Sequence, residues 1–190
     1  LTPEQQSEYL EVIEEESLRL AALANNVLNL TQVENQTILT DITTFNLSEQ
    51  IRGAVLLLAE KWMPKRLDMD LQFGEYTIAA NEELLKQVWI NLLDNAIKFS
   101  EPGGTVAVEI TEADDTLAIS VLNHGKDIPP DSIAHIFNKF YQADESHSSE
   151  GNGIGLAVVK KVCLLHGGSV TVTSGDGTTA FTVRLPKSRD

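Results

Sequence analysis

Two asparagines and a lysine stand at a spacing that could hold the phosphates of a nucleotide. Asn91, Asn95 and Lys98 are separated by four and three residues, so they share one face if the segment is helical. Amide oxygens are good ligands for a hard cation such as Mg²⁺, and a lysine one turn further along can reach phosphate oxygens. A merely solvated helix face is the alternative interpretation, although two asparagines in mid-helix, where they are poor helix formers, require a reason.

A glycine-rich segment, residues 151–156, is the second candidate for phosphate binding. Gly151, Gly153 and Gly155 alternate with larger residues and lead into a predicted helix. Residues without side chains allow backbone N–H groups to approach phosphates at the positive end of a helix. The segment is not a dinucleotide-binding fingerprint, because no strand directly precedes it and no βαβ unit surrounds it.

These candidates must be positioned by a mixture of helices and strands. Periodicity and capping residues predict helices over 3–34, 48–64, 81–99 and 156–165, and a short one near 132–137. Alternation predicts strands over 44–47, 67–73, 76–80, 105–111, 117–122, 169–174 and 179–185, with 67–73 and 76–80 forming a hairpin. The fold class is therefore α+β: a two-layer α/β sandwich in which helices cover one face of a mixed, mostly antiparallel sheet, preceded by a long bundle helix.

The predicted first helix carries an apolar stripe of its own. Leu10, Ile13, Leu20 and Val27 lie on one side of it, and an amphipathic helix of this length cannot bury such a stripe alone. We expect it to pair with another helix, from elsewhere in the parent protein or from a second subunit. Folding back onto its own domain is the alternative.

Composition limits the classes of partner. The net charge of −14, from 28 acidic and 14 basic residues, repels nucleic acid and anionic lipid over a broad surface but leaves room for one small anion. The longest apolar stretches are far shorter than the roughly 20 residues of a membrane span, so we expect no membrane insertion of this chain. Cys163, the only cysteine, lies in an apolar run and is expected to be a buried packing residue.

The order and spacing of these motifs resemble the histidine-kinase branch of the Bergerat ATPases. Residues 91–99 resemble the N box of that family, 121–129 its first glycine box, 136–141 its F box, 151–156 its second glycine box and 175–179 its closing glycine-threonine segment. The resemblance covers about residues 45–186, and the leading helix resembles the second helix of the dimerisation stem. It implies a stem segment over 1–38 and an ATP-binding catalytic domain over 39–190, with a lid at about 138–154.

The resemblance also implies ATP and Mg²⁺ as cofactors and assigns roles to single residues. Asn95 should ligate Mg²⁺, while Asn91 and Lys98 should contact the phosphates or their metal. The full set of expected ATP-binding residues is Asn91, Asn95, Lys98, Phe99, Asn123, Gly125, Ile128, Lys139, Phe140, Gly151, Gly153, Ile154, Gly155, Leu156, Thr178 and Thr179. The final threonine segment fits in two registers, so Thr178 and Thr179 remain alternatives for one role.

Three positions depart from the family pattern. Asn123 replaces the aspartate that recognises adenine, Asp127 replaces the second glycine of the same box, and Gln142 stands where many relatives have an arginine. An asparagine oxygen can still accept a hydrogen bond from the adenine amino group, but a neutral acceptor makes a weaker bond than a carboxylate. We therefore expect ATP binding to survive these changes in weakened form.

The implied activity is that of a protein histidine kinase. Hydrolysing relatives of this fold carry a glutamate four residues before the metal-binding asparagine, where this chain has Asn91, and an amide cannot activate water. The implied reaction transfers the γ-phosphoryl group of ATP to a histidine on a dimeric helical stem, and then to the receiver domain of a response regulator. None of the four histidines lies in the first helix, so we expect the acceptor histidine outside this chain.

Two other functions remain alternatives: a serine kinase of the sigma-factor regulator type, and a nucleotide-binding regulatory module without catalysis. The resemblance further implies a homodimer formed through the stem. It also implies a cytoplasmic location for this part of a parent protein that is anchored in the bacterial membrane.

Overall fold

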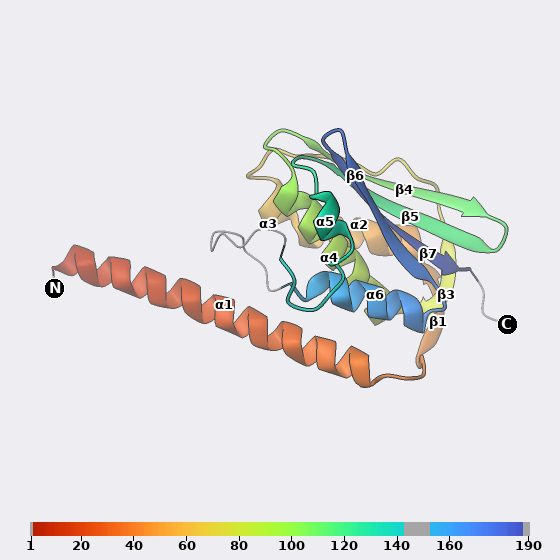
Figure 1. Ribbon diagram of the computed structural model, residues 1–190, viewed down its shortest axis with the longest axis horizontal. Coiled ribbons are helices and arrows are strands. Elements are labelled where there is room, and N and C mark those ends of the chain that lie inside the picture. The colour runs from red at the N-terminus through yellow and green to blue at the C-terminus, as the bar shows by residue number, and fades with distance from the viewer. Residues whose placement is uncertain (1, 143–152, 188–190) are drawn as a thin grey trace.

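The computed structural model describes residues 2–142 and 153–187, and shows a long helix lying beside a two-layer domain (Figure 1). Helices α2, α4 and α6 cover one face of a twisted sheet, as the α+β prediction requires. The helices are α1 (Pro3–Asn35), α2 (Leu47–Leu57), α3 (Ala59–Trp62), α4 (Glu82–Phe99), α5 (Pro130–Ile133) and α6 (Gly155–Leu165). The strands are β1 (Ile42–Asn46), β2 (Asp68–Asp70), β3 (Thr77–Asn81), β4 (Thr105–Ala113), β5 (Thr116–His124), β6 (Ser169–Gly175) and β7 (Thr178–Pro186).

Helix α1 begins with a capping box and ends against the domain. Thr2 accepts a hydrogen bond from the backbone of Gln5, whose side chain bonds back to the Thr2 backbone. Leu30 and Val33, in its last turns, belong to the main core beside α6. The α1 end therefore folds back onto the domain, which was the alternative to a partner helix.

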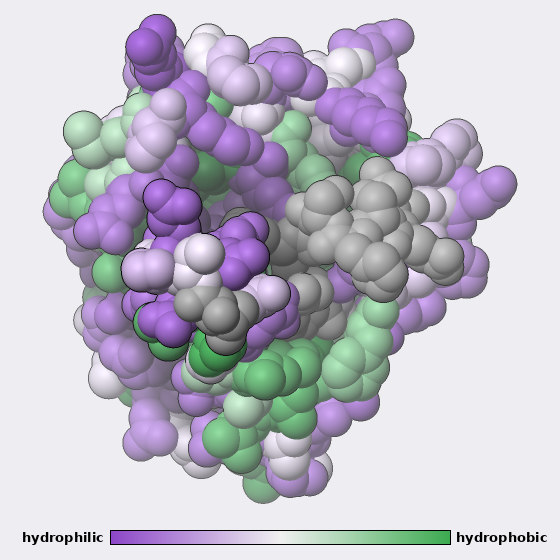
Figure 2. All heavy atoms as spheres, turned by 90° about the vertical axis from the view of Figure 1, so that its left-hand side faces the viewer, coloured by the Kyte–Doolittle hydropathy of each residue, from purple (hydrophilic) through white to green (hydrophobic). Residues whose placement is uncertain are grey.

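The earlier turns of α1 project away from the domain and expose their apolar residues. Leu10, Ile13 and Leu20 are each more than half exposed. Figure 2 looks at the end where α1 begins, and apolar atoms gather in the lower half of that view, where α1 lies. The stripe predicted for a bundle helix is thus presented outward. None of the helices in the described ranges combines the length and apolar character that crossing a membrane requires.

The strands form two sheets. A five-stranded sheet has the order β2-β4-β5-β7-β6, in which β2 runs parallel to β4 and every other pair is antiparallel. Strands β1 and β3 pair with each other in a separate antiparallel ribbon. The predicted pairing of the runs 105–111 and 117–122 is confirmed.

The predicted hairpin of residues 67–73 and 76–80 is wrong. Strand β2 pairs with β4, and β3 pairs with β1. The chain between them is tied to the start of α2 instead, because the Ser48 hydroxyl donates to the Gly74 carbonyl and the Leu47 amide donates to the Tyr76 carbonyl. These bonds carry the chain from one sheet to the other and prevent a tight turn.

The single helix predicted over 48–64 is also wrong, because it breaks at Leu58. The Leu58 amide bonds the Val55 carbonyl at 3.2 Å, one residue short of helical spacing, and the Trp62 indole donates to that same carbonyl at 2.9 Å. Helix α2 therefore ends at Leu57, and the short helix α3 begins at Ala59. The short helix predicted near 132–137 is observed as α5, which begins at Pro130 and ends at Ile133.

Helix α4 separates an apolar face from a polar one. The Asn81 side chain caps its first turn by accepting from the Leu84 amide at 2.9 Å, as predicted, and Lys65 caps its last turn by donating to the carbonyls of Ile97 and Lys98. One face packs into the core through Leu85, Val88, Trp89, Leu92, Leu93, Ala96 and Ile97. The other face, which carries the predicted metal and phosphate ligands, is left at the edge of the core.

His166 closes the end of α6 against the start of α4. Its side chain is buried, with Nδ1 bonded to the Val162 carbonyl at 2.8 Å and Nε2 accepting from the Asn81 amide at 3.2 Å. His166 therefore caps the end of α6 and packs it against the start of α4.

The thiol of Cys163 should be inert in the folded protein. It is fully buried in α6, and this burial raises the pKa of Cys163 to about 12. At pH 8 on the order of one such thiol in ten thousand would be ionised, and the thiolate is the reactive form.

We expect Cys163 not to react with a disulfide reagent in buffer and to react stoichiometrically in guanidinium. The variant Leu164→Cys, which places a second thiol at an exposed neighbouring position, should react with one equivalent in the native state. Rapid native labelling of Cys163 itself would contradict the packing assignment.

Candidate functional site

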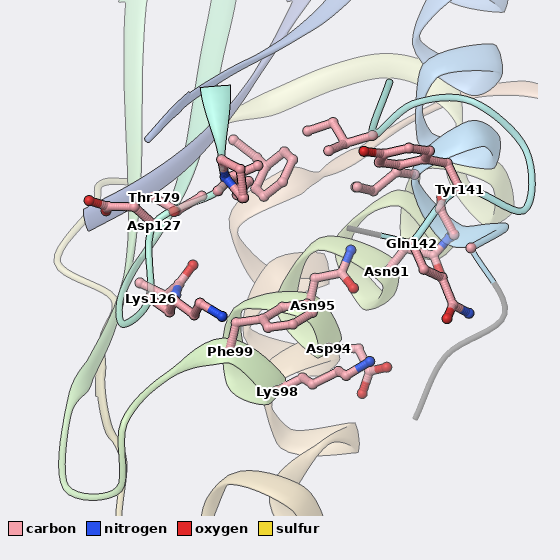
Figure 3. A pocket seen from close by; sticks show the side chains of 18 of the residues that line it. Asn91, Asp94, Asn95, Lys98, Phe99, Lys126, Asp127, Tyr141, Gln142 and Thr179 are labelled. Carbon is pink, nitrogen blue, oxygen red and sulfur yellow. The ribbon is translucent and has the colours of Figure 1, made fainter. Parts of the chain in front are cut away.

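A cavity of about 340 Å³ lies between α4, the end of β5, the start of α6 and the loops that follow β5 and α5 (Figure 3). One residue of α1 also reaches it. Its wall is formed by Asn26, Asn91, Asp94, Asn95, Lys98, Phe99, Asn123, Lys126, Asp127, Ile128, Pro129, Ile136, Tyr141, Gln142, Gly153, Gly155, Leu156, Thr179 and Phe181. Segments more than a hundred residues apart in the chain thus meet at one space.

The structure brings most of the predicted site residues to this wall. Those that line it are Asn91, Asn95, Lys98, Phe99, Asn123, Ile128, Gly153, Gly155, Leu156 and Thr179. The polar stripe of α4 and the glycine-rich segment, predicted separately, therefore face the same cavity. Gly151 lies outside the described residues, as does the part of the predicted lid between 143 and 152.

Asn91 and Asn95 occupy different positions on the polar face of α4. The Asn91 amide donates to the Gly155 carbonyl at 3.3 Å, and a Cβ at Gly155 would stand 3.4 Å from the Asn91 oxygen. Within the described ranges no residue hydrogen-bonds the Asn95 side chain, which is half-buried on the wall. Asn91 thus holds α4 close to the start of α6, and Asn95 offers an amide to the cavity.

The charged residues of the wall include both signs. Figure 3 shows Asp94 and Lys98 together at the end of α4, with Lys126 reaching in from the loop after β5. Asp94 pairs with Lys61 at 2.6 Å, and the Lys98 ammonium lies 4.9 Å from the centre of the Phe99 ring. The α6 helix also begins at this wall, so the positive end of its dipole faces the same space.

Gly125 positions the loop after β5 without lining the cavity. A Cβ at this residue would overlap the carbonyl oxygen of Phe99 and stand 3.2 Å from its carbonyl carbon. The Gly125 amide donates to the Gly177 carbonyl at 3.0 Å, and Asp127 Oδ1 accepts from the Gly177 amide at 3.0 Å. The loop is therefore held between the end of α4 and the turn that joins β6 to β7.

Asn123 and Thr179 face each other across the β5–β7 ladder. They are direct partners in the antiparallel register, and both side chains are buried. Thr179 Oγ1 lies 2.7 Å from the Ser174 hydroxyl, which accepts from the Ile128 amide at 2.9 Å. Thr178 pairs with His124 instead and does not reach the wall, so the geometry favours Thr179 over Thr178.

Four other predicted residues, besides Thr178, stand away from the wall. Phe140 has a positive φ of 62° and is largely exposed, and its amide donates to the Gly153 carbonyl at 2.8 Å. Lys139 forms an ion pair with Glu34 of α1. Ile154 is buried in the core, and Gly125 acts through the loop described above.

Several wall residues were missed by sequence reasoning. Asp94 had a usable signal, because it lies between the two asparagines on the same helix turn. Phe181 alternates with polar neighbours in the last strand, but alternation does not say which cavity a strand borders. Asn26 had no signal, since only the packing of α1 on the domain brings it there. It also lines a second cavity, of about 580 Å³, between α1 and α4.

The comparisons with known proteins agree with this geometry. A model of the family described as "Histidine kinase-, DNA gyrase B-, and HSP90-like ATPase" matches residues 80–189. The circadian input-output histidine kinase CikA of Synechococcus elongatus is 35% identical over 192 aligned residues, covering 97% of this chain and 25% of CikA. The sensor histidine kinase CusS of Escherichia coli O157:H7 is 33% identical over 177 residues, covering 91% of this chain and 36% of CusS. The chain thus spans about a quarter to a third of these relatives.

Two solved structures superpose over nearly the whole chain. Full-length ShkA in complex with AMPPNP has a TM-score of 0.82 at 27% identity, covering 100% of this chain and 40% of that one. Histidine kinase ThkA in complex with the response regulator protein TrrA has a TM-score of 0.79 at 26% identity, covering 99% of this chain and 53% of that one. The chain therefore belongs to the histidine kinase-, DNA gyrase B- and HSP90-like ATPase family, as a catalytic domain of the sensor histidine kinase type.

Proposed function

We propose that this chain binds Mg-ATP in the 340 Å³ cavity and transfers the γ-phosphoryl group to a histidine on a dimeric helical stem. From there the group would pass to an aspartate in the receiver domain of a response regulator. The observation that carries the proposal is that the polar stripe of α4 and the start of α6 line one cavity. Two relatives named as histidine kinases, the structural neighbour ShkA solved with AMPPNP, and histidine kinase ThkA solved with a response regulator support it.

The wall residues fit a nucleotide held through a metal. Mg²⁺ usually takes one or two protein ligands and completes its shell with water and substrate phosphates. The described residues contain no cluster of three or more His, Cys, Asp or Glu side chains that could hold a metal unaided, so the phosphates would have to complete the shell. The Asn95 amide would hold Mg²⁺, which when bound neutralises charge that develops on the phosphates.

The remaining wall residues would bind and orient the nucleotide. Lys98 would contact phosphate oxygens, and the backbone N–H groups at the start of α6 would receive them at the positive end of that helix. The apolar wall residues Ile128, Ile136 and Phe181 would pack against the base. Segments 138–142 and 153–154 are the described parts of the proposed lid, which would exclude water when it closes.

Transfer to a protein side chain is favoured over hydrolysis. A hydrolase needs a general base near the attacking water, and an amide at Asn91 cannot serve as one. Of the carboxylates on the wall, Asp94 is paired with Lys61 and Asp127 accepts from the Gly177 amide. The wall positions phosphates and metal, and the nucleophile is left to come from outside. We assign residues 1–38 to the stem and 39–190 to the catalytic domain.

Labelling with ATP tests whether this chain binds ATP while the acceptor histidine lies outside it. Incubated with γ-labelled ATP and Mg²⁺, the 190-residue chain should bind ATP but give no acid-labile, base-stable phosphoprotein, because α1 carries no histidine. Adding the preceding stem helix, in the same chain or as a separate dimeric stem, should produce label on that stem. The matched control replaces the stem histidine by glutamine and should erase the label.

Three outcomes would overturn the proposal. Stoichiometric phosphohistidine on the 190-residue chain, for instance at His124 or His147, would place the acceptor within it. Label on a serine of an added partner would point to a serine kinase. ATP binding without any transfer, to the stem or to a partner, would indicate a regulatory nucleotide-binding module.

A further inference from the structure

The side-chain amide of Asn123 is buried in the cavity wall without a hydrogen-bond partner among the described residues. The residue is 3% exposed and lines the cavity at the end of β5. Among the described residues, every side-chain nitrogen or oxygen that is fully shielded from solvent has a hydrogen-bond partner. Because the Asn123 amide has none, it must be accessible from the cavity. Buried polar groups are nearly always paired, and an unpaired amide facing a cavity points to a ligand that supplies the partner.

The surroundings of this amide suit a flat ring. Ile128, Ile136 and Phe181 line the same cavity, which makes this part of the wall apolar. Gly125 lies next to the amide, since a Cβ there would be in van der Waals contact with Asn123 Nδ2 at 3.7 Å. The ladder holds the Asn123 backbone, because it pairs with Val106 on one side and with Thr179 on the other. No hydrogen bond from the described residues fixes which end of the side-chain amide is the oxygen.

An amide offers an acceptor and a donor side by side, and a half-turn about its last bond exchanges them. Adenine presents a donor, its 6-amino group, beside the acceptor N1. Guanine in the same pose presents an acceptor, O6, beside the donor N1–H. The amide of Asn123 can match either edge with two hydrogen bonds, whereas a carboxylate offers only acceptors and would face guanine O6 with like charge.

The neighbouring hydroxyl pair is reversible in the same way. Ser174 and Thr179 are 2.7 Å apart, and either can be the donor. In both arrangements the Ser174 oxygen accepts from the Ile128 amide. When Ser174 donates to Thr179, the Thr179 proton is free to be donated into the cavity; when Thr179 donates to Ser174, its oxygen can accept there. The Thr179 hydroxyl, the second polar group beside the ring, can therefore donate or accept a hydrogen bond as the ligand requires.

We propose that Asn123 makes this cavity accept guanine as well as adenine nucleotides, so that it determines base specificity. The inference rests on the proposed nucleotide-binding function and adds the class of base that the site admits.

Calorimetric titration of the 190-residue chain with Mg-AMPPNP and Mg-GMPPNP tests this proposal. In the unaltered chain the two Kd values should lie within about tenfold of each other, because each base forms the same number of hydrogen bonds. The variant Asn123→Asp should widen the ratio in favour of the adenine nucleotide by about tenfold or more. Asn123→Ala should weaken both nucleotides without separating them. The control Asn35→Asp adds the same charge at an exposed residue off the wall and outside the proposed lid, and should leave the ratio unchanged.

The failures of the two proposals are distinguishable. An unaltered chain that binds the guanine nucleotide more than about a hundredfold more weakly than the adenine nucleotide overturns the inference and leaves the proposed function standing. An unaltered chain that binds neither nucleotide overturns the proposed function. Because the ratio is first measured without any substitution, the test does not depend on the folding of the variants.

Discussion

Replacing Asn95 by alanine should abolish the Mg²⁺-dependent part of ATP binding and leave the fold intact. The side chain is half-buried on the cavity wall, contributes nothing to the core cluster, and has no hydrogen-bond partner among the described residues. Its removal takes away the proposed metal ligand without opening a cavity in the core. ATP titrations with Mg²⁺ and with a chelator should therefore give the same Kd in the variant and different values in the unaltered chain.

A matched control for this variant lies on the same helix. Gln87 also carries an amide, is partly exposed, and does not border the 340 Å³ cavity. Gln87→Ala should keep the difference between Mg²⁺ and chelator, and both variants should melt within a few degrees of the unaltered chain. Unchanged affinity of Asn95→Ala for ATP in Mg²⁺ would show that the metal ligand has been misplaced.

Replacing Gly125 by alanine should destabilise the domain more than any exposed substitution. The new Cβ would overlap the Phe99 carbonyl oxygen, which belongs to the backbone at the end of α4 and cannot rotate away as a side chain would. We expect a loss of about 3 kcal/mol, at the upper end of the usual cost of overpacking. For a chain of this length that corresponds to a fall in Tm of about 6–12 °C. Nucleotide affinity should fall as well, because Lys126 to Pro129 move with the loop.

The control for this variant is Gly175, the last residue of strand β6. A Cβ at Gly175 meets nothing within 4 Å, so Gly175→Ala should change Tm little. Thermal unfolding followed by circular dichroism gives both values. Equal Tm values for Gly125→Ala and Gly175→Ala would mean that the loop can move away from Phe99 at no cost, and that its position is not held as the structure indicates.

The packing of α1 links the proposed stem segment to the cavity that we propose binds the nucleotide. Leu30 and Val33 anchor the end of α1 in the core. Glu34 pairs with Lys139 of the proposed lid, and Asn26 reaches the cavity wall. These contacts lie within two and a half turns of one another on the helix. A movement of the stem relative to the domain would therefore change the wall of the site.

Local sequence determined the elements that carry the site. The 3.6-residue period and the Asn81 cap predicted α4, and its polar face followed from the spacing of Asn91, Asn95 and Lys98. The β4–β5 pair was predictable because its strands are close in the chain and joined by a short turn. The observed α+β class agrees with the periodicity of the sequence, because the period of the apolar residues differs between a helix and a strand. The family found by comparison agrees with the motifs on these elements.

For elements far apart in the chain, only the tertiary structure decided which ones meet. Alternation predicted β2 and β3 as extended, but hydrogen bonds from the start of α2 sent them to different sheets. The ladder between β5 and β7, formed by strands more than fifty residues apart, placed Thr179 rather than Thr178 beside Asn123. Asn26 reached the cavity because α1 packs on α6. Periodicity reports the conformation of a segment and which side it buries, whereas the choice of partner depends on the combined packing and hydrogen bonding of segments far apart in the chain.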